Sequence, residues 1–423
     1  MKRKVLCAIL SPICLLACAL GLVACDDGNP PTHTHSWSTV WEKDDTHHWH
    51  DCVVADCPVT DNSQKNGYAQ HDFSDGDCVC GKVNLAANLK FELEPDNASY
   101  AITGIMDNTI TELTLPDIYN RKPVSRINYM AFSDCRRLTS VTIPDSITSI
   151  EEYAFAGCSS LTEVAFGNQL KSIGDYVFDG CRKLTTITIP DSLKSIGEGA
   201  FNGCAIETAA IPAIACSSVN TFTLKTVVIT SGDRIDDEAF LNCSSLATIT
   251  ISDSVKSIGE SAFGNCVSLT DITIPDEVTD IGKDAFYNCS VKTATIPASA
   301  IESIPKTILN TVVITSGNSI DEYAFNFCIN LTSVTIPESV NTIGENAFNH
   351  CNKLKTVSYK GEITGWCDIS GLSNLTKNVS DLTLLINGRE LTELTVPNTV
   401  TFIPAYAFYN CTGLTSVTLS DSV

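Results

Sequence analysis

Residues 138–160 read LTSVTIPDSITSIEEYAFAGCSS, and this 23-residue pattern recurs along most of the chain. Apolar residues occupy positions 1, 4, 6, 10, 13, 17, 18 and 21 of the pattern. No single copy can bury this apolar set by itself, so the copies must stack against one another. The repeat therefore predicts a solenoid. Further copies begin at Leu161, Leu184, Leu246, Leu269, Leu331 and Leu391.

Each copy predicts two extended legs and a turn. Val141 and Ile143 flank a polar residue, which is the period of a half-buried strand, and Pro144 ends that strand. In a stack of copies such strands run parallel. Ile147 and Ile150 predict a short return leg, and the Ala-Phe-x-x-Cys segment after it predicts one short helical turn with three side chains facing the core. Glycines after the return leg predict a tight bend: Gly174, Gly197, Gly259, Gly282 and Gly344.

Three longer units interrupt the pattern. Two units of 39 residues, 207–245 and 292–330, each contain two strand signatures. The first coil of each pair lacks the Ala-Phe-x-x-Cys turn, so we expect the convex side to be thinner there. A unit of 37 residues, 354–390, contains Asn387-Gly388, which predicts a β-hairpin.

The layout of the repeat region follows from these units. Residues 89–106 predict a capping hairpin, within a segment, 83–137, that holds the N-terminal cap and a first, longer repeat. The solenoid proper is predicted over 138–423. The sequence ends ten residues into a repeat, and because a solenoid needs a polar cap, we expect a truncated last repeat.

The motif L-x-x-V-x-I-P-x-x-V-x-x-I-G-x-x-A-F-x-x-C closely resembles that of the BspA-like bacterial surface leucine-rich repeat family, over about three quarters of the chain. The resemblance implies a leucine-rich repeat solenoid, curved and located outside the cell, that serves adhesion to other cells or host proteins. Single coils depart from the motif at Phe166-Gly167, Val177 and Ser252.

The N-terminal residues 1–25 read MKRKVLCAILSPICLLACALGLVAC, a basic tip followed by a long apolar run. This is the layout of a bacterial export signal. The residues up to Cys25 resemble a lipobox, which implies that Cys25 is lipidated, although the stretch ending at Cys18 fits the same pattern. The alternatives are a plain cleaved signal and an uncleaved anchor, because residues 5–24 are long enough to span a bilayer. Residues 26–34 then form a short polar tether.

A compact Cys/His-rich module is predicted over residues 35–82. Six of the seven histidines lie between His33 and His71, and a segment this small cannot fold on its own apolar core. The module is similar to Cys/His-rich modules near the N-termini of secreted bacterial repeat proteins, which implies zinc binding. Two disulfides, or an unstructured His-rich tract, are the alternatives. The candidate zinc ligands are Cys52, Cys57, Cys78 and Cys80, with His71 or one of His47, His48 and His50 as substitutes.

The composition excludes several classes of function. Lys and Arg number 27 against 49 Asp and Glu, which gives a net charge of −22, whereas nucleic-acid binding needs a cationic surface. The repeat region has one histidine, His350, at a position expected to face solvent. Its carboxylates recur with the repeat as solvated faces, and it has no glycine-rich phosphate loop. We therefore expect neither nucleic-acid binding nor an enzyme.

Cysteine and threonine ladders accompany the repeat. Ten cysteines, from Cys135 to Cys411, occupy position 21, where we expect small buried groups whose parallel Cβ directions prevent disulfides. Cys216 and Cys367 fall outside this register and are candidates for free reactive thiols. The middle strand position predicts an exposed ladder of Thr142, Thr188, Thr250, Thr273, Thr335, Thr395 and Thr418.

The function predicted from these features is that of a cell-surface protein, anchored through a lipid, that binds a protein on a host, matrix or neighbouring cell. One alternative is a glycan-binding or accessory lipoprotein, because Tyr153, Tyr176, Tyr323 and Tyr406 recur before the Ala/Val-Phe pair and could present an aromatic platform. The other is a passive spacer that presents the Cys/His module.

Overall fold

The computed structural model describes residues 42–43, 47–50, 66–70, 86–219, 222–377 and 379–423. The chain divides into two compact units, Met1–Ala87 and Asn88–Val423. The described part of the first unit is an antiparallel sheet in the order β1 (Glu42–Lys43), β2 (His47–His50) and β3 (Asn66–Gln70). None of the helices among the described residues is long and apolar enough to cross a membrane.

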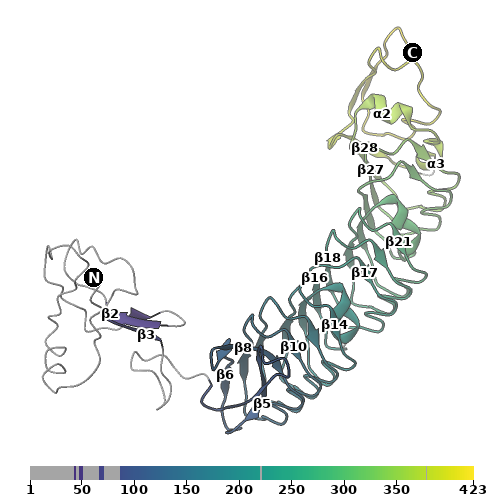
Figure 1. The fold of residues 1–423 in the computed structure, drawn as a ribbon. Helices are drawn as coiled ribbons and strands as arrows, with labels where there is room; N and C mark the ends of the chain where they lie inside the picture. Colours follow the sequence, from purple (N-terminus) through teal and green to yellow (C-terminus); the bar gives the residue numbers. More distant parts are fainter. Residues whose placement is uncertain (1–41, 44–46, 51–65, 71–85, 220–221, 378) are drawn as a thin grey trace, which may run out of the picture. The chain divides into compact units, whose positions relative to one another are not determined.

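The second unit is a stack of coils whose strands pair in parallel, as the repeat predicts (Figure 1). One side of the stack, here named the long-strand face, follows the inner side of the curve through β16, β18, β27 and β28. Its strands are β6 (Glu112–Thr114), β9 (Ser140–Thr142), β11 (Glu163–Ala165), β13 (Thr186–Thr188), β15 (Thr208–Ile211), β16 (Thr226–Ile229), β18 (Thr248–Ile251), β20 (Asp271–Thr273), β22 (Thr293–Ile296), β23 (Thr311–Ile314), β25 (Ser333–Ile336), β27 (Thr356–Tyr359), β28 (Thr383–Ile386), β30 (Glu393–Thr395) and β31 (Ser416–Thr418).

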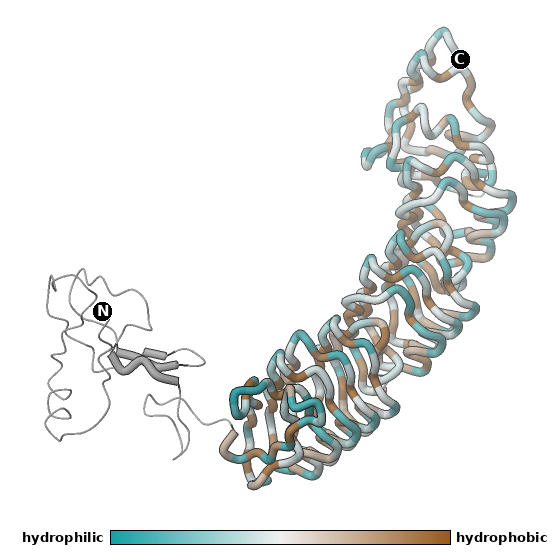
Figure 2. The backbone as a smooth tube through the Cα atoms, in the orientation of Figure 1, coloured by the Kyte–Doolittle hydropathy of each residue, from teal (hydrophilic) through white to brown (hydrophobic). Residues whose placement is uncertain are grey.

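The return legs form a second row of parallel pairs, here named the short-strand face. In each pair the serine or its equivalent lies beside that of the next coil, as Ser149 does beside Ser172. The strands are β10 (Ser149–Ile150), β12 (Ser172–Ile173), β14 (Ser195–Ile196), β17 (Arg234–Ile235), β19 (Ser257–Ile258), β21 (Asp280–Ile281), β24 (Ser319–Ile320) and β26 (Thr342–Ile343). Hydrophobic and hydrophilic residues alternate along the coils (Figure 2), so each coil has one set of hydrophobic side chains to bury.

The predicted capping hairpin is confirmed. β4 (Leu89–Leu93) pairs antiparallel with β5 (Tyr100–Ile105), and β5 pairs parallel with β8 (Lys122–Ile127). β8 in turn pairs parallel with β10, so the cap joins the short-strand face. β7 (Ile118–Tyr119) pairs with β8 from its own hairpin. The Phe91 and Tyr119 rings stack with centroids 3.8 Å apart, so aromatic contact holds the cap to the first repeat.

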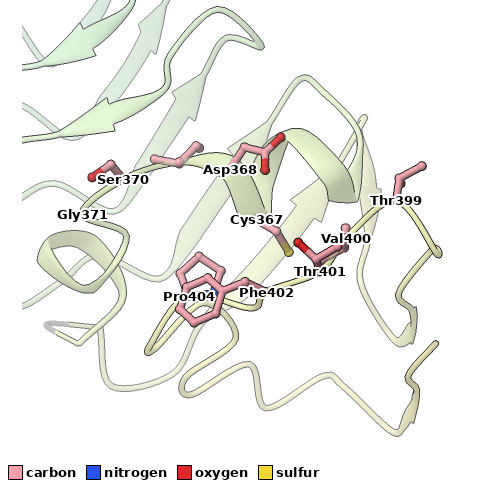
Figure 3. A pocket seen from close by; sticks show the side chains of 10 residues that line it. Cys367, Asp368, Ser370, Gly371, Thr399, Val400, Thr401, Phe402 and Pro404 are labelled. Atoms are coloured by element: carbon pink, nitrogen blue, oxygen red, sulfur yellow. The ribbon is translucent and has the colours of Figure 1, made fainter. Parts of the chain in front are cut away.

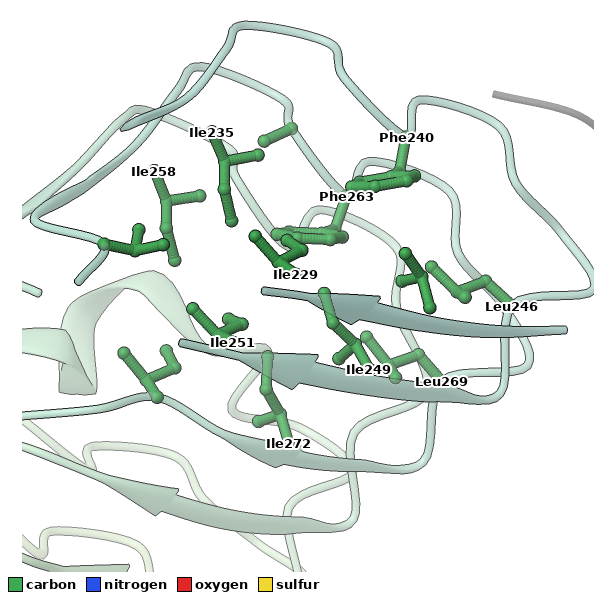
Figure 4. Packing of buried hydrophobic residues seen from close by; sticks show 14 of the residues in the cluster. Ile229, Ile235, Phe240, Leu246, Ile249, Ile251, Ile258, Phe263, Leu269 and Ile272 are labelled. Carbon is green, nitrogen blue, oxygen red and sulfur yellow. The ribbon is translucent and has the colours of Figure 1, made fainter. Parts of the chain in front are cut away.

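The phenylalanines of the Ala-Phe-x-x-Cys segments form the centre of the core. Their rings stack between successive coils, for example Phe240 on Phe263 with centroids 5.3 Å apart and planes 11° apart (Figure 4). The ladder is divided into three stacks at the two 39-residue units, although one hydrophobic cluster is continuous throughout. The ladder residues are at most 1% exposed: Phe132, Phe155, Phe178, Phe201, Phe240, Phe263, Phe286, Phe325 and Phe348.

The Ala-Phe-x-x-Cys segment forms a series of hydrogen-bonded turns instead of the helical turn that its spacing predicts. Alternate N–H groups donate to the next coil, as Phe155 does to the Val177 carbonyl at 2.9 Å. The N–H groups between them donate three residues back, as Cys158 does to Phe155 at 3.3 Å. Such alternation needs left-handed backbone, which occurs at Tyr153 (φ 56°) and Gly157 (φ 75°) and at the same two positions of the other turns.

Nine of the ten ladder cysteines are buried, Cys411 is partly exposed, and none of the ten forms a disulfide; the ladder also has a further role. The Cys266 thiol donates a hydrogen bond from Sγ to the Phe240 carbonyl oxygen of the preceding coil at 3.3 Å. The contact with the Cys289 thiol, together with burial, raises the pKa of Cys266, so the donor proton is retained. The same bond, 3.0–3.4 Å long, is made by Cys158, Cys181, Cys204, Cys289 and Cys351.

Cys216 and Cys367 are free thiols, as predicted, but their burial contradicts the prediction that they are reactive. Cys216 has 0% and Cys367 5% exposure. Burial raises the pKa of Cys367 to about 11 and raises that of Cys216 as well, with the Asp368 and Asp236 carboxylates adding to the effect. Because the thiolate is the reactive form of cysteine, neither side chain is suited to reaction.

The two 39-residue units each contain two strands of the long-strand face, as predicted, and a 3-10 helix replaces the missing turn. The helices are η2 (Ala213–Val219) and η3 (Ala298–Ser303). Asp191 accepts hydrogen bonds from Thr230 Oγ1 and Ser231 Oγ, both at 2.6 Å, across η2. The Ser231 bond, then the Thr230 bond, lowers the pKa of Asp191. Asp276 accepts the equivalent pair of bonds from Thr315 and Ser316 across η3, so the two 39-residue units make the same contact.

The 37-residue unit contains the predicted hairpin and two helices that the repeat pattern does not predict. β28 turns into β29 (Arg389–Glu390) through Asn387 and Gly388, whose φ angles of 49° and 76° suit this turn. The helices are α2 (Ile363–Asp368) and α3 (Ser373–Thr376). The Trp366 side chain of α2 is fully buried and donates to the Ala407 carbonyl at 3.1 Å.

Candidate binding surfaces

Most of the site residues predicted from the sequence lie outside the described residues. These are the lipidation site Cys25 and the zinc ligands Cys52, Cys57, Cys78, Cys80 and His71. His50 lies at the end of β2, where its backbone pairs with Asn66. Within the described ranges, no group of three or more His, Cys, Asp or Glu residues could hold a metal ion. Zinc binding and lipidation therefore stay predictions.

The long-strand face presents hydroxyl groups over most of its length. The predicted threonine column is confirmed, with Thr335 partly covered and the others exposed. A second column, not predicted, runs beside it, because Thr208 pairs with Thr226 and Thr226 with Thr248. On the outward positions from β13 to β28, Asp271 is the one charged residue. This stretch of the face is therefore nearly neutral in a strongly acidic chain.

The turns form a third side of the stack, here named the turn face. At one position of the turns, two neighbouring coils carry aromatic residues that the other coils lack. The residue before the ladder cysteine is left-handed in all ten turns, and in eight of them it is Gly, Asn or Asp. The exceptions are Phe327 (φ 61°) and His350 (φ 62°), whose rings stack with centroids 4.4 Å and planes 16° apart. Phe327 is 55% exposed and Ile329, two residues on, is 47% exposed.

Phe327, Ile329 and His350 are together named the Phe327 patch. Left-handed backbone costs an L-residue about 1–2 kcal/mol, and the cost is lower for Asn or Gly than for Phe. Asn242, Asn265 and Asn288 show the usual solution at this position, since their side-chain amides hydrogen-bond to one another at 2.8 and 3.0 Å. Phe327 bears this backbone cost and cannot make the amide hydrogen bonds that asparagine makes. Its aromatic ring is exposed, so it adds nothing to the core.

The tyrosines at the first left-handed position do not form one aromatic platform. Tyr153 and Tyr176 stack face to face with centroids 5.3 Å apart, and the exposed Tyr129 meets Tyr153 edge-on. Rings stacked in this way cover each other's faces, which are the surfaces a sugar would need. Tyr323 and Tyr406 lie in separate turns, where they are 47% and 50% exposed.

An open cavity of about 410 Å³ lies where α2 meets the last coil (Figure 3). One wall comes from the end of α2 and the residues after it, including Asp368 and Ser370. The other wall includes Thr401 and Phe402, and the Phe402 side chain is 70% exposed. No signal in the repeat pattern locates this cavity, because it depends on how the helical insertion displaces the next coil.

Comparison with known proteins identifies the repeat. The description "BspA type Leucine rich repeat region (6 copies)" matches residues 103–231, 233–354, 306–368 and 385–423. This chain belongs to the BspA-type leucine-rich repeat family. The resemblance drawn from the motif is thus confirmed, and the family's repeat scaffold accounts for the coils from the first repeat to the end of the sequence.

Solved structures similar to this BspA-type chain include repeat proteins of several bacteria. A leucine rich cell surface protein of Faecalibacterium prausnitzii is 29% identical, with 79% of this chain and 94% of that chain covered and a TM-score of 0.37. A leucine-rich repeat protein of Bacteroides ovatus is 22% identical, with 79% and 98% covered and a TM-score of 0.35. An internalin of Listeria monocytogenes is 15% identical, with 74% and 83% covered and a TM-score of 0.30. No curated protein matches the chain.

Proposed function

We propose that this BspA-type chain is an exported surface protein that binds a protein partner through the Phe327 patch, in adhesion to a host, a matrix or a neighbouring cell. The observation that carries the proposal is the exposed Phe327 ring on left-handed backbone, stacked on His350. Strained residues that persist without a structural gain occur at functional sites.

The chemistry of the patch suits a protein interface. Exposed aromatic side chains supply much of the binding energy at such interfaces, and a few of them dominate. Ile329 donates its backbone N–H to the Phe327 carbonyl at 2.7 Å, which fixes the isoleucine beside the aromatic pair. The nearly neutral stretch of the long-strand face from β13 to β28 adds area without the repulsion that a net charge of −22 would cause elsewhere.

Phe327→Asn restores the residue that the repeat favours and is expected to weaken partner binding strongly while the fold is kept or stabilised. Loss of a central aromatic contact at an interface costs about 2 kcal/mol or more, which is about thirtyfold in Kd. The full chain would be screened against arrayed host and bacterial surface proteins, and Kd measured for each hit with parent and variant. Thermal unfolding of both chains would be measured in parallel.

Asn288→Phe provides the matched control, because it places the same ring at the same position of another coil. This variant should keep the binding of the parent. If every protein hit bound the parent and Phe327→Asn equally, the partner would bind outside the Phe327 patch, which would contradict the proposal. A glycan hit with no protein hit would instead favour the glycan-binding alternative.

We also propose that a lipid on Cys25 anchors the chain to the membrane, on the support of the lipobox-like residues that end there. Cys25→Ser is expected to leave the protein soluble or as an unprocessed precursor. Cell fractionation with mass spectrometry of the N-terminus measures this, and Cys18→Ser, which should be processed normally, is the control. A Cys25→Ser protein that is processed and membrane-bound like the parent would rule the anchor out.

A further inference from the structure

The short-strand face is interrupted between residues 369–371 and 401–403. In a regular coil, the Lys171 N–H donates to the Thr148 carbonyl and the Gly174 N–H to the Ile150 carbonyl, both at 2.8 Å. By repeat position, Thr401 corresponds to Lys171 and Pro404 to Gly174. Proline has no N–H, so the second of these bonds cannot form in the last coil.

Backbone groups on both sides of the interruption lack partners. Ser370 pairs with the preceding coil, since its N–H donates to Asn341 and its carbonyl accepts from Ile343, both at 2.8 Å. Because successive residues of an extended segment point their polar groups to opposite sides, the Ile369 carbonyl is directed the other way. Within the part of the chain that the structure describes, neither that carbonyl nor the N–H groups of Thr401 and Phe402 have a hydrogen-bond partner.

The cavity of about 410 Å³ separates these two edges (Figure 3). Hydrogen bonds from the helical insertion to the last coil fix the position of one edge relative to the other. Trp366 of α2 donates to the Ala407 carbonyl at 3.1 Å, and Thr376 of α3 donates from Oγ1 to the Tyr406 carbonyl at 2.7 Å. Both side chains are fully buried. The two edges are thus fixed by bonds outside the cavity and cannot simply close on each other.

We propose that this cavity, here named the slot, binds an extended basic peptide segment of a partner protein, whose main chain pairs with the two open edges and completes the short-strand face. Unpaired strand edges bind peptides through main-chain hydrogen bonds, and side chains then select the sequence. Asp368 lies exposed in one wall and has no ion pair among the described residues. A Lys or Arg on the peptide meets this carboxylate, and the net charge of −22 favours the approach of a basic chain.

A short acetylated peptide of alternating lysine and valine, labelled with fluorescein, is the probe. Its binding to the full chain in detergent, followed by fluorescence anisotropy at low salt, is expected to saturate. Its backbone N-methylated form should bind about tenfold more weakly, because it cannot pair with the edges. Asp368→Asn should weaken binding about three- to fivefold, as expected for an exposed charge pair. Thr401→Trp, which fills the slot, should abolish it.

Two controls separate the slot from other basic-peptide contacts. Asp253→Asn removes an exposed carboxylate from another coil and should leave the affinity unchanged. Phe327→Asn should also leave it unchanged, so the slot and the Phe327 patch can fail independently. Equal binding of the N-methylated peptide, equal binding by Thr401→Trp, or no saturable binding up to about 1 mM would overturn the proposal.

Discussion

Replacing Phe263 with alanine is expected to open one coil and its immediate neighbours while the rest of the solenoid stays folded. The Phe263 ring is fully buried between those of Phe240 and Phe286, with centroids 5.3 and 5.2 Å away. Truncating a buried Phe to Ala costs about 3–5 kcal/mol. Since each coil of a solenoid contacts only its neighbours, the loss stays local. Hydrogen exchange along the full chain would show faster exchange around residues 240–289.

Thr273→Ala is the matched control, because Thr273 lies exposed on β20 in the next coil. A substitution at an exposed site changes the free energy of unfolding by about 0.5 kcal/mol or less. If Thr273→Ala were as damaging as Phe263→Ala, the assignment of inward and outward positions would be wrong. Uniform acceleration of exchange over the whole repeat region would instead disprove the local character of the damage.

Gly259→Ala is expected to separate two coils, although glycine here is not in a left-handed conformation. A Cβ at Gly259 would lie 2.4 Å from the Asp237 backbone nitrogen and 2.6 Å from the Asp236 carbonyl carbon. Both atoms belong to the backbone of the preceding coil, so no side-chain rotation relieves the overlap. Overpacking of this kind costs about 1–3 kcal/mol, occasionally more. A lower midpoint in urea unfolding, with faster exchange at residues 236–260, would measure the effect.

Gly104→Ala offers a matched control, because a Cβ there would meet its nearest atom, Lys90 Cδ, at 3.6 Å, an ordinary contact. This substitution should leave the urea midpoint nearly unchanged. A Gly259→Ala chain as stable as the parent would mean that the coils can separate at little cost, and the close stacking of the short-strand face would then be unimportant for stability.

The sequence alone determined the architecture of the repeat region, because the same apolar positions recur and can be buried in only one way. The alternation at Val141 and Ile143 set the long strands, and the Ala-Phe-x-x-Cys spacing set the buried ladder. The predicted hairpins were found, since Asn387-Gly388 adopts the backbone angles that its turn requires. Local chemistry was sufficient in each of these cases.

The reason for the recurring glycines was decided by the tertiary structure. The sequence predicted bends at Gly174, Gly197, Gly259, Gly282 and Gly344, yet each lies where a regular coil passes directly beneath it and a Cβ would overlap that coil's backbone. The equivalent positions Asp236 and Asp321 lie within the 39-residue units, after the 3-10 helices, and carry side chains. Which coil lies beneath a residue is a property of the stack, so it cannot be derived from one repeat.

The candidate surfaces depended on tertiary structure even more. The chain itself shows Phe327 in place of Asn, but only the left-handed φ and the stacking on His350 make that residue an outlier. Likewise, Cys216 and Cys367 differ from the ladder in sequence position, and only burial shows that they are unreactive. The slot beside Asp368 arises from two helices that displace one coil from the next. A repeat pattern specifies which side chains each coil buries, whereas the candidate binding surfaces form where coils depart from the pattern. The effect of each departure depends on contacts with residues far away in the sequence, which only the tertiary structure shows.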